Sequence, residues 1–228
     1  MNLQDRMEHI HAGILARKNL TPTIAPALTR EEKEKLQKIE QSLQQVPLMY
    51  RGKNFADFNI DYTEQMKVKA IALRYVETFA TRLQNGNAIL FSGSPGTGKT
   101  LLALIIHQAL SKAGHYVHYE PGLQFLRTLQ EKNMESTTAF SKLSHFYQSM
   151  DLLIIDEAAQ GRVKGSELLD WEKEMLFTIA NVRNQAKLPT LLITNLNKEN
   201  FYDALSLRIA ERFMQQAITL AFNWKSYR

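Results

Sequence analysis

A glycine-rich octapeptide near the middle of the chain has the residue types and spacing of a phosphate-binding loop, or P-loop. It follows a short apolar run at 89–91 and leads into a run of helix formers at 101–104. Glycines let backbone N–H groups approach a phosphate that a side chain would keep away, and the start of the helix adds its positive dipole end. We therefore expect the chain to bind ATP through Gly93, Ser94, Pro95, Gly96, Thr97, Gly98, Lys99, Thr100 and Leu101.

Two side chains of this loop have roles of their own in the expected chemistry. Lys99 should reach the β- and γ-phosphates, where its charge would assist both binding and catalysis. The hydroxyl of Thr100 should be an oxygen ligand of the Mg²⁺ ion that accompanies ATP. A glycine-rich turn without a ligand is the plain structural alternative, but the flanking strand and helix favour the phosphate site.

A pair of carboxylates ends a second apolar run further along the chain, at 152–156. Asp156 closes this run and Glu157 follows it directly, which is the Walker B arrangement. We expect Asp156 to hold the magnesium ion, directly or through water. Glu157 should act as the base that polarises the attacking water. An acidic pair at a strand end is often only a solvated loop start, and the phosphate-binding loop is what favours the catalytic interpretation here.

Three further polar residues are candidates for catalysis. Asn195 follows a buried run at 190–194, where a sensor residue would orient the lytic water, although a simple strand cap is the alternative. Arg208 and Arg212 are spaced i and i+4, so both guanidinium groups lie on one face of the expected helix. One of them, Arg212 first and Arg208 second, should act as an arginine finger toward a neighbouring subunit. A surface ion pair with Glu211 is the alternative.

The elements that must position these residues alternate between helix and strand from about residue 51. Five short apolar runs separated by helical segments predict an α/β fold with a five-stranded, mostly parallel sheet covered on both faces. We place the strands at 88–92, 116–120, 152–156, 190–194 and 217–222. One helix is expected at 61–83, with Met66, Ile71, Leu73, Val76 and Phe79 among its apolar positions. The segments 130–138 and 158–165 are expected to be mobile connections.

Residues 1–50 have a different pattern and predict a small helical region. Leu3, Met7, Ile10 and Ile14 share one helical face, and a second helix begins with a capping box formed by Thr29 and Glu32. The second helix carries an apolar stripe and ends at Pro47. Two short amphipathic helices cannot enclose a core by themselves, so they must pack on the domain at 51–228 or on a partner. We expect a partner-binding role for them.

Composition sets further limits on function. The chain has no cysteine, which excludes a disulfide framework, a thiolate zinc site and a cysteine nucleophile. No apolar run is long enough to span a bilayer, so we expect a cytoplasmic protein without membrane contact. Lys and Arg number 28 against 23 Asp and Glu. This mild excess is ordinary for solubility and also suits contact with nucleic acid.

With these motifs in order, residues from about 54 to the C-terminus resemble the DnaC family of bacterial replicative helicase loaders, a branch of the AAA+ ATPases. The most particular similarity is the closing segment Phe222-Asn223-Trp224-Lys225-Ser226-Tyr227-Arg228. A departure is found at Thr100-Leu101, where the best-known loader has Asn-His. Only six residues follow Phe222, so we expect an AAA+ core without a C-terminal lid. Residues 1–50 do not resemble the family in detail.

The resemblance implies a scheme of action in DNA replication. Protomers would assemble with ATP into a homo-oligomeric spiral, in which each Arg212 completes the site of its neighbour. The helices at 1–50 would bind the replicative DNA helicase hexamer, and the ATPase domain would touch single-stranded DNA. Lys164, Ser166 and Trp171 are the candidates for the DNA contact, because single-strand binding uses positive charge and aromatic stacking. Trp171 can equally be a core residue.

Other functions share much of this pattern. A transposition helper ATPase of the IstB type has the same core and differs in what its N-terminal region binds. A module that holds ATP without much turnover is a third possibility. Small-molecule kinases also contain a P-loop, but the Asp156-Glu157 pair and the trailing arginines argue against that class. A helicase loader is the interpretation that we favour.

Overall fold

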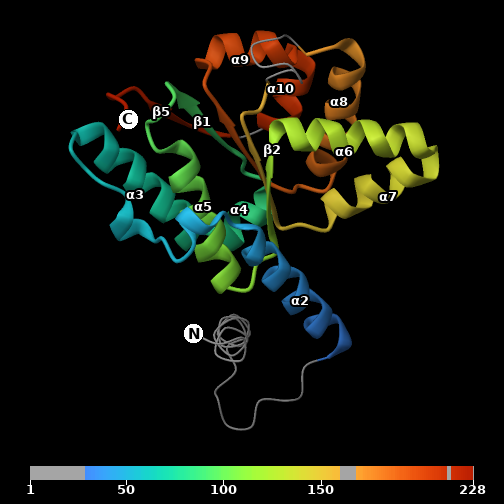
Figure 1. The fold of residues 1–228 in the computed structure, drawn as a ribbon, viewed down its shortest axis with the longest axis horizontal. Coiled ribbons are helices and arrows are strands. Elements are labelled where there is room, and N and C mark those ends of the chain that lie inside the picture. The colour runs from blue at the N-terminus through green and yellow to red at the C-terminus, as the bar shows by residue number, and fades with distance from the viewer. Residues whose placement is uncertain (1–28, 160–167, 215–216, 228) are drawn as a thin grey trace.

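The computed structural model describes residues 29–159, 168–214 and 217–227. Within these ranges one sheet is formed, with the strand order β2-β3-β4-β1-β5 and every neighbouring pair parallel (Figure 1). The expected α/β class and parallel sheet are confirmed. The strands are β1 (Ile89–Gly93), β2 (Val117–Pro121), β3 (Leu152–Asp156), β4 (Thr190–Thr194) and β5 (Ile218–Phe222).

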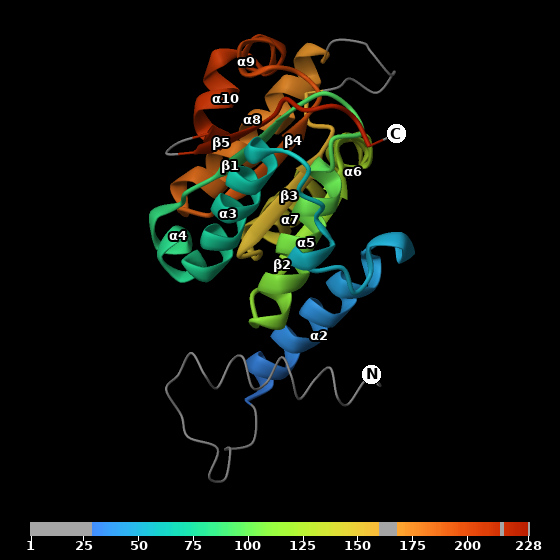
Figure 2. The same cartoon turned by 90° about the vertical axis from the view of Figure 1, so that its left-hand side faces the viewer.

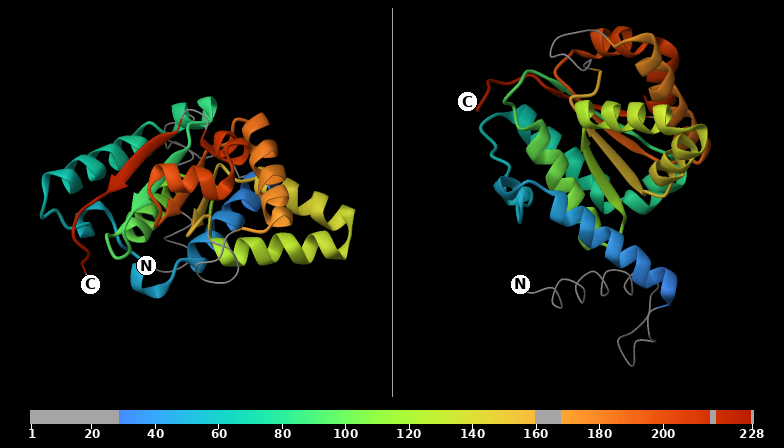
Figure 3. Two further views of the ribbon diagram at one scale, coloured as in Figure 1. Left: turned by 90° about the horizontal axis from the view of Figure 1, so that it is seen from above. Right: turned by 45° about the vertical axis from the view of Figure 1, so that its right-hand side comes forward.

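Helices cover both faces of the sheet (Figures 2 and 3). One face carries α3 (Thr63–Glu77), α4 (Phe79–Asn85) and α5 (Lys99–Lys112). The other face carries α6 (Gly122–Glu135), α7 (Thr137–Gln148), α8 (Asp170–Gln185), α9 (Lys198–Leu205) and α10 (Leu207–Met214). The sheet therefore lies between two helical layers, as a parallel sheet requires.

The alternation of side chains along each strand divides the core into two clusters. In β3, Leu152 and Ile154 belong to the cluster under α3 and α5, whereas Leu153 and Ile155 belong to the cluster under α6 to α10. Successive strand residues point to opposite faces, so a strand buried on both faces must be apolar throughout. This is why β3 reads as an unbroken apolar run before Asp156.

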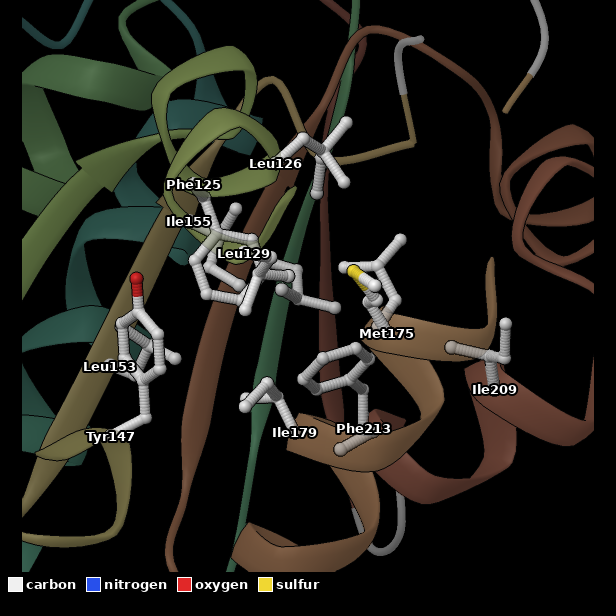
Figure 4. Packing of buried hydrophobic residues seen from close by; sticks show 14 of the residues in the cluster. Phe125, Leu126, Leu129, Tyr147, Leu153, Ile155, Met175, Ile179, Ile209 and Phe213 are labelled. Atoms are coloured by element: carbon white, nitrogen blue, oxygen red, sulfur yellow. The ribbon is translucent and has the colours of Figure 1, made fainter. Parts of the chain in front are cut away.

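Side chains from four helices meet over one face of β3. Phe125 of α6, Tyr147 of α7, Ile179 of α8 and Phe213 of α10 belong to one core cluster with Leu153 and Ile155 of β3 (Figure 4). The Phe125 and Tyr147 rings are 5.0 Å apart between centroids, in an edge-to-face arrangement. This cluster fixes the carboxyl end of β3, where the two acidic residues of the expected site follow.

The helix expected after Thr29 is present as α2 (Arg30–Gln45), and its capping box with Glu32 is formed. Leu36 and Ile39 are buried in the same core cluster as the helices of the main domain. Ser42 donates to the carbonyl of Val117 on the edge strand β2 and lies 2.9 Å from a ring nitrogen of His107. The packed core thus extends across the sequence boundary at residue 50. The helix expected from Leu3, Met7, Ile10 and Ile14 lies outside the described residues.

The prediction of one helix at 61–83 is wrong, because the segment divides into α3 and α4 near Thr78. Its apolar positions do not all face the core. Met66 and Leu73 are 53% and 40% exposed, and Val68, Ala72 and Tyr75 face the core instead. The buried set has the i, i+4, i+7 spacing of one helical face, whereas Met66, Ile71 and Leu73 lie outside it.

The segment at 130–138 is not a mobile connection. Residues up to Glu135 continue α6, and α7 begins directly after Ser136, whose side chain accepts a hydrogen bond from the Ala139 amide. The polar residues belong to the solvent face of α6, whose opposite face buries Leu126 and Leu129. Of the connection expected at 158–165, only residues 158 and 159 are described.

The described residues after β5, 223–227, contain no helix. They run back toward the start of α5 and make contacts that are described below. Among the helices in the described ranges, none is both long and apolar enough to cross a membrane.

Asp151 joins α2 to the strands that precede the site. Its Oδ2 accepts from Lys35 of α2 at 3.1 Å and from the backbone N–H of Tyr116 at 2.8 Å, and His115 lies 3.4 Å away. Burial alone would raise the pKa of Asp151, but His115, Lys35 and the Tyr116 amide lower it to about 2. An ordinary Asp in the unfolded chain titrates near 3.9.

The variant Asp151→Asn should therefore lower the free energy of unfolding at pH 7 by about 2 kcal/mol. A depressed carboxyl pKa stabilises the folded state above the unfolded pKa, and this contribution is lost as pH falls through the folded value. The difference between wild type and variant should accordingly shrink below about pH 4. Urea unfolding at pH 7, 4 and 3 measures it, with the exposed Asp203→Asn as the control. A difference that did not change with pH would contradict the ionic origin.

Candidate functional site: a nucleotide cavity at the carboxyl edge of the sheet

The expected phosphate-binding loop connects β1 to α5. Gly93, the last residue of β1, pairs with Phe222 of β5 and has a φ of +138°. A Cβ at this position would collide with the Phe222 carbonyl oxygen, so only glycine is tolerated. Gly98, with a φ of +91°, precedes the first turn of α5. The sequence therefore folds into a tight strand-to-helix turn whose N–H groups are available to an anion.

The side chain of Lys99 makes hydrogen bonds to the backbone of its own loop. Its Nζ donates to the carbonyl of Gly93 at 2.6 Å and to that of Ser94 at 2.7 Å. Burial lowers the pKa of Lys99 to about 8, against the opposing effect of Asp156 and Glu157. The ammonium group is thus desolvated, and no ion pair to it is found within the described ranges. Phosphate oxygens would supply the missing negative charge.

Asp156 and Thr100 form an oxygen-lined corner beside Lys99. The Thr100 hydroxyl donates to Asp156 Oδ2 at 2.8 Å, and the carboxylate is almost fully buried at the end of β3. Magnesium prefers oxygen ligands and is often held by one or two protein groups together with substrate phosphates. The residues present fit such an ion, because the donor set consists of a carboxylate and a hydroxyl.

Tyr119 is a member of this corner that the sequence analysis missed. Its hydroxyl donates to the same Asp156 oxygen at 3.0 Å. Burial and the nearby Asp156 carboxylate raise the pKa of Tyr119, so the phenol keeps its proton. Tyr119 lies on β2 and pairs in register with Ile154. The contact between Tyr119 and Asp156 depends on how β2 and β3 pair, and the sequence alone does not give the register of that pairing.

Glu157 has an unusual backbone conformation for its residue type. Its φ is +57°, its amide donates to Asp156 Oδ1 at 2.9 Å, and the next amide, of Ala158, donates to the Ile193 carbonyl of β4 at 2.8 Å. A non-glycine residue in this region costs free energy and is found mostly at functional sites. The turn leaves the Glu157 side chain exposed, beside the buried Asp156.

These elements enclose a cavity of about 310 Å³ at the carboxyl ends of β1, β3 and β4. Crevices outside the carboxyl ends of parallel strands are the usual ligand sites of α/β folds. Asn195, which follows β4, lines the cavity as expected. The other expected lining residues are Pro95, Gly96, Gly98, Lys99, Thr100, Leu101, Asp156 and Glu157. Gly93, Ser94 and Thr97 do not line it and form the backbone of the loop instead.

Three lining residues come from segments that the sequence analysis did not assign to the site. Met49 and Tyr50 belong to a short 3₁₀ turn, η1 (Leu48–Tyr50), and Tyr227 belongs to the C-terminal segment. Apolar and aromatic groups of this kind suit a flat nucleobase or a sugar. No motif marks Met49 or Tyr50 in the sequence.

Arg208 and Arg212 are exposed on α10 and do not line the nucleotide cavity. The guanidinium carbon of Arg208 lies 4.0 Å from the centroid of the Phe177 ring. Arg212 lines a different cavity, of about 320 Å³, together with Lys187 and Leu188, which precedes β4. Arg212 therefore lies near the amino ends of the strands, whereas Asp156 lies at their carboxyl ends. The surface ion pair with Glu211, which was the alternative to the finger, is not found among the described residues.

The residues expected to contact DNA are only partly described. Trp171, in the first turn of α8, is partly buried and packs against the core cluster under α6 to α10. The core interpretation of Trp171 is thus the one with a structural contact behind it. Lys164 and Ser166 lie outside the described residues.

The variant Lys99→Ala should weaken ATP binding by at least about tenfold, because a hydrogen bond from a charged donor contributes roughly 1.5–3 kcal/mol. The melting temperature should change little by comparison, since the lysine is desolvated at a cost in the free protein. Isothermal titration calorimetry with ATP measures the affinity. Lys112→Ala, at the exposed end of the same helix, is the control and should bind as wild type does. Unchanged affinity of Lys99→Ala would remove this residue from the phosphate site.

The comparisons with solved structures show the same fold. The "Crystal structure of the DnaC helicase loader" superposes with a TM-score of 0.67 at 20% identity, over 77% of this chain and 99% of that chain. The "Crystal Structure of the DnaI" gives 0.63 at 18% identity, over 81% and 95%. The "Replication initiator DnaA bound to AMPPCP and single-stranded DNA" gives 0.63 at 20% identity, over 79% and 52%. The AAA+ P-loop fold is thereby confirmed, as is the resemblance to DnaC-type proteins.

A search of the curated proteins finds no match. The model of one protein family matches residues 23–228, which include α2 and the whole nucleotide cavity. On that match, the chain belongs to the family described as "IstB-like ATP binding protein".

Proposed function

We propose that this protein is an ATP-hydrolysing loader of the replicative DNA helicase. The observation that supports it best is the convergence of Lys99, Thr100, Asp156, Glu157 and Asn195 on one cavity. A binding module would need only the phosphate loop. A carboxylate base and a polar sensor beside the loop are what hydrolysis adds.

In the proposed mechanism, the N–H groups of the P-loop and Lys99 hold the β- and γ-phosphates. Glu157 accepts the proton of the attacking water, and Asn195 orients that water. Thr100 and Asp156 hold Mg²⁺. When bound, this ion neutralises charge on the phosphate oxygens. Tyr119 keeps Asp156 oriented through its hydrogen bond to Oδ2.

Hydrolysis in this proposal needs a second copy of the chain. Arg212 is at the far edge of the sheet from its own nucleotide cavity, so it cannot stabilise the phosphate in its own protomer. Placed on a neighbour, the same residue would supply the positive charge that a phosphoryl transition state needs. An ATP-dependent homo-oligomer follows from this arrangement, with Arg208 as the second candidate finger.

The partners are proposed from the named relatives. DnaC is described as a helicase loader and DnaA as bound to single-stranded DNA. By analogy, the N-terminal region of this chain binds the helicase hexamer, and the ATPase domain contacts single-stranded DNA. The second candidate function is a transposition helper ATPase, which the description of the matching family favours. The two functions share the ATP site and differ in the partner.

Co-purification tests the partner. The full chain should elute with the replicative helicase of the same genome in the presence of ATP. A version lacking residues 1–28 should keep its ATP affinity and melting temperature, because α2 and the sheet remain, and should lose the helicase. If the full chain did not co-purify with the helicase but did with a transposase from the same genome, the protein would be a transposition helper and not a helicase loader. A truncated chain that still bound the helicase would place the interface outside residues 1–28.

Mixing two inactive variants tests the arginine finger. Glu157→Gln should bind ATP as wild type does and hydrolyse almost none, since only the base is lost. Arg212→Ala should also bind ATP, and its turnover should fall by about a thousandfold, the scale of fingers in other phosphoryl-transfer systems. Mixtures of the two should regain activity, because some interfaces then join an intact finger to an intact base. Arg127→Ala, which removes an exposed arginine of α6 outside both cavities, is the matched control. Wild-type turnover by Arg212→Ala would exclude this residue.

A further inference from the structure

The C-terminal segment provides an inference about the nucleotide site that rests on the proposed ATP binding. We propose that residues 222–227, named here the C-terminal clasp, orient two peptide groups of the P-loop for phosphate binding. Trp224 and the backbone of Tyr227 act as positioning groups in this proposal.

The clasp donates hydrogen bonds to two backbone carbonyl oxygens of the loop. The indole N–H of Trp224 donates to the Thr97 carbonyl at 3.1 Å, and the backbone N–H of Tyr227 donates to the Gly96 carbonyl at 3.0 Å. The Trp224 contact is sheltered, since Thr97 is fully buried and Trp224 is 8% exposed. Two other carbonyls of the loop, those of Gly93 and Ser94, accept from Lys99.

Planar peptide geometry turns these contacts into a constraint on the phosphate site. In a trans peptide the C=O and the following N–H point in opposite directions. Because Tyr227 holds the Gly96 carbonyl, the Thr97 N–H of the same peptide points away from the Tyr227 amide. Because Trp224 holds the Thr97 carbonyl, the Gly98 N–H points away from the indole in the same way. The N–H groups of such a loop are the donors that it offers to phosphate.

The clasp is itself anchored on both sides, so it can impose this orientation. The Phe222 and Trp224 rings are 4.9 Å apart, and Phe58 meets Trp224 edge-on at 6.5 Å between ring centroids. The Tyr227 hydroxyl accepts from Gln65 of α3 at 2.8 Å and donates to the Asn59 carbonyl at 3.2 Å. The Tyr227 side chain also lines the nucleotide cavity.

The test compares two aromatic substitutions of the same kind. Trp224→Phe keeps a packed ring and removes the N–H donor. Tyr75→Phe is the matched control, because the Tyr75 hydroxyl is a buried donor to a backbone carbonyl, that of Asn87 at 3.0 Å, and does not line the cavity. Calorimetry with ATP and with ADP, at a temperature where both variants are folded, gives the affinities.

Trp224→Phe should bind ATP and ADP about tenfold more weakly than wild type, which corresponds to the loss of one buried hydrogen bond's orienting effect. Tyr75→Phe should lower the melting temperature about as much as Trp224→Phe does, because each removes one buried donor to a backbone carbonyl. Its affinity for ATP and ADP should stay at the wild-type value. Equal affinities of Trp224→Phe and wild type would overturn the clasp and leave the proposed ATPase intact. An equal loss of affinity in both variants would also overturn it, since stability would then explain the effect. A wild-type protein that bound no ATP would overturn the proposed function itself.

A second pair of variants isolates the backbone donor. Tyr227→Ala keeps the N–H and removes the ring, whereas Tyr227→Pro removes both. The proline variant should bind ATP several-fold more weakly than the alanine variant, with the melting temperatures of both as controls. If the two bound ATP equally, the Tyr227 amide would have no orienting role.

Discussion

The parallel direction of β1, β3 and β4 is the constraint on which the site depends. Because the three strands run together in one sheet, their carboxyl ends meet at one edge, and the residues that follow them share one cavity. Lys99 follows β1, Asp156 ends β3 and Asn195 follows β4. An antiparallel order would have separated these residues by the length of the sheet. The two helical layers matter to function because they pack on both faces of the sheet and so hold the strand ends in place.

Much of this site could be predicted from the sequence, because its residues directly follow buried strands. The P-loop, the acidic pair and Asn195 each adjoin an apolar run, and such runs mark strands buried on both faces. Tyr119, Met49 and Tyr50 could not be found in this way. Tyr119 reaches Asp156 through strand register, and the other two reach the cavity through tertiary packing of a short turn. None of these relations leaves a pattern in the sequence.

The buried face of α3 is not marked by residue type alone. In α3, Met66 and Leu73 are apolar but exposed, whereas Gln65 is fully buried and bonds the Tyr227 hydroxyl and the Asp61 and Tyr62 amides. A polar residue with several partners can occupy a core position, so apolar residue types alone do not identify the face of the helix that is buried. The role of Gln65 becomes visible only when the C-terminal segment lies beside it.

The segment between α2 and α3 connects the N-terminal region to the nucleotide cavity. Tyr50 lines the cavity, and its carbonyl accepts from the side-chain amide of Gln108 on α5 at 2.9 Å. The side-chain oxygen of Gln108 accepts in turn from the Gly52 amide at 2.8 Å. Arg51 donates back to the Val46 carbonyl at 2.7 Å at the end of α2. Three residues, 46–48, thus separate the end of α2 from Met49, the first residue that lines the cavity, and side-chain contacts fix both ends of that stretch.

This connection bears on how a partner and ATP can affect each other. A partner that bound the N-terminal region and moved α2 would act on Ser42, Lys35 and the chain leading to Tyr50 together, because all three are tied to the sheet or to α5. If ATP binding also depended on the position of α2, the partner and ATP would change each other's affinity by the same factor. The contacts of α2 with the sheet, and of Tyr50 with α5, are the physical connection that such coupling would use.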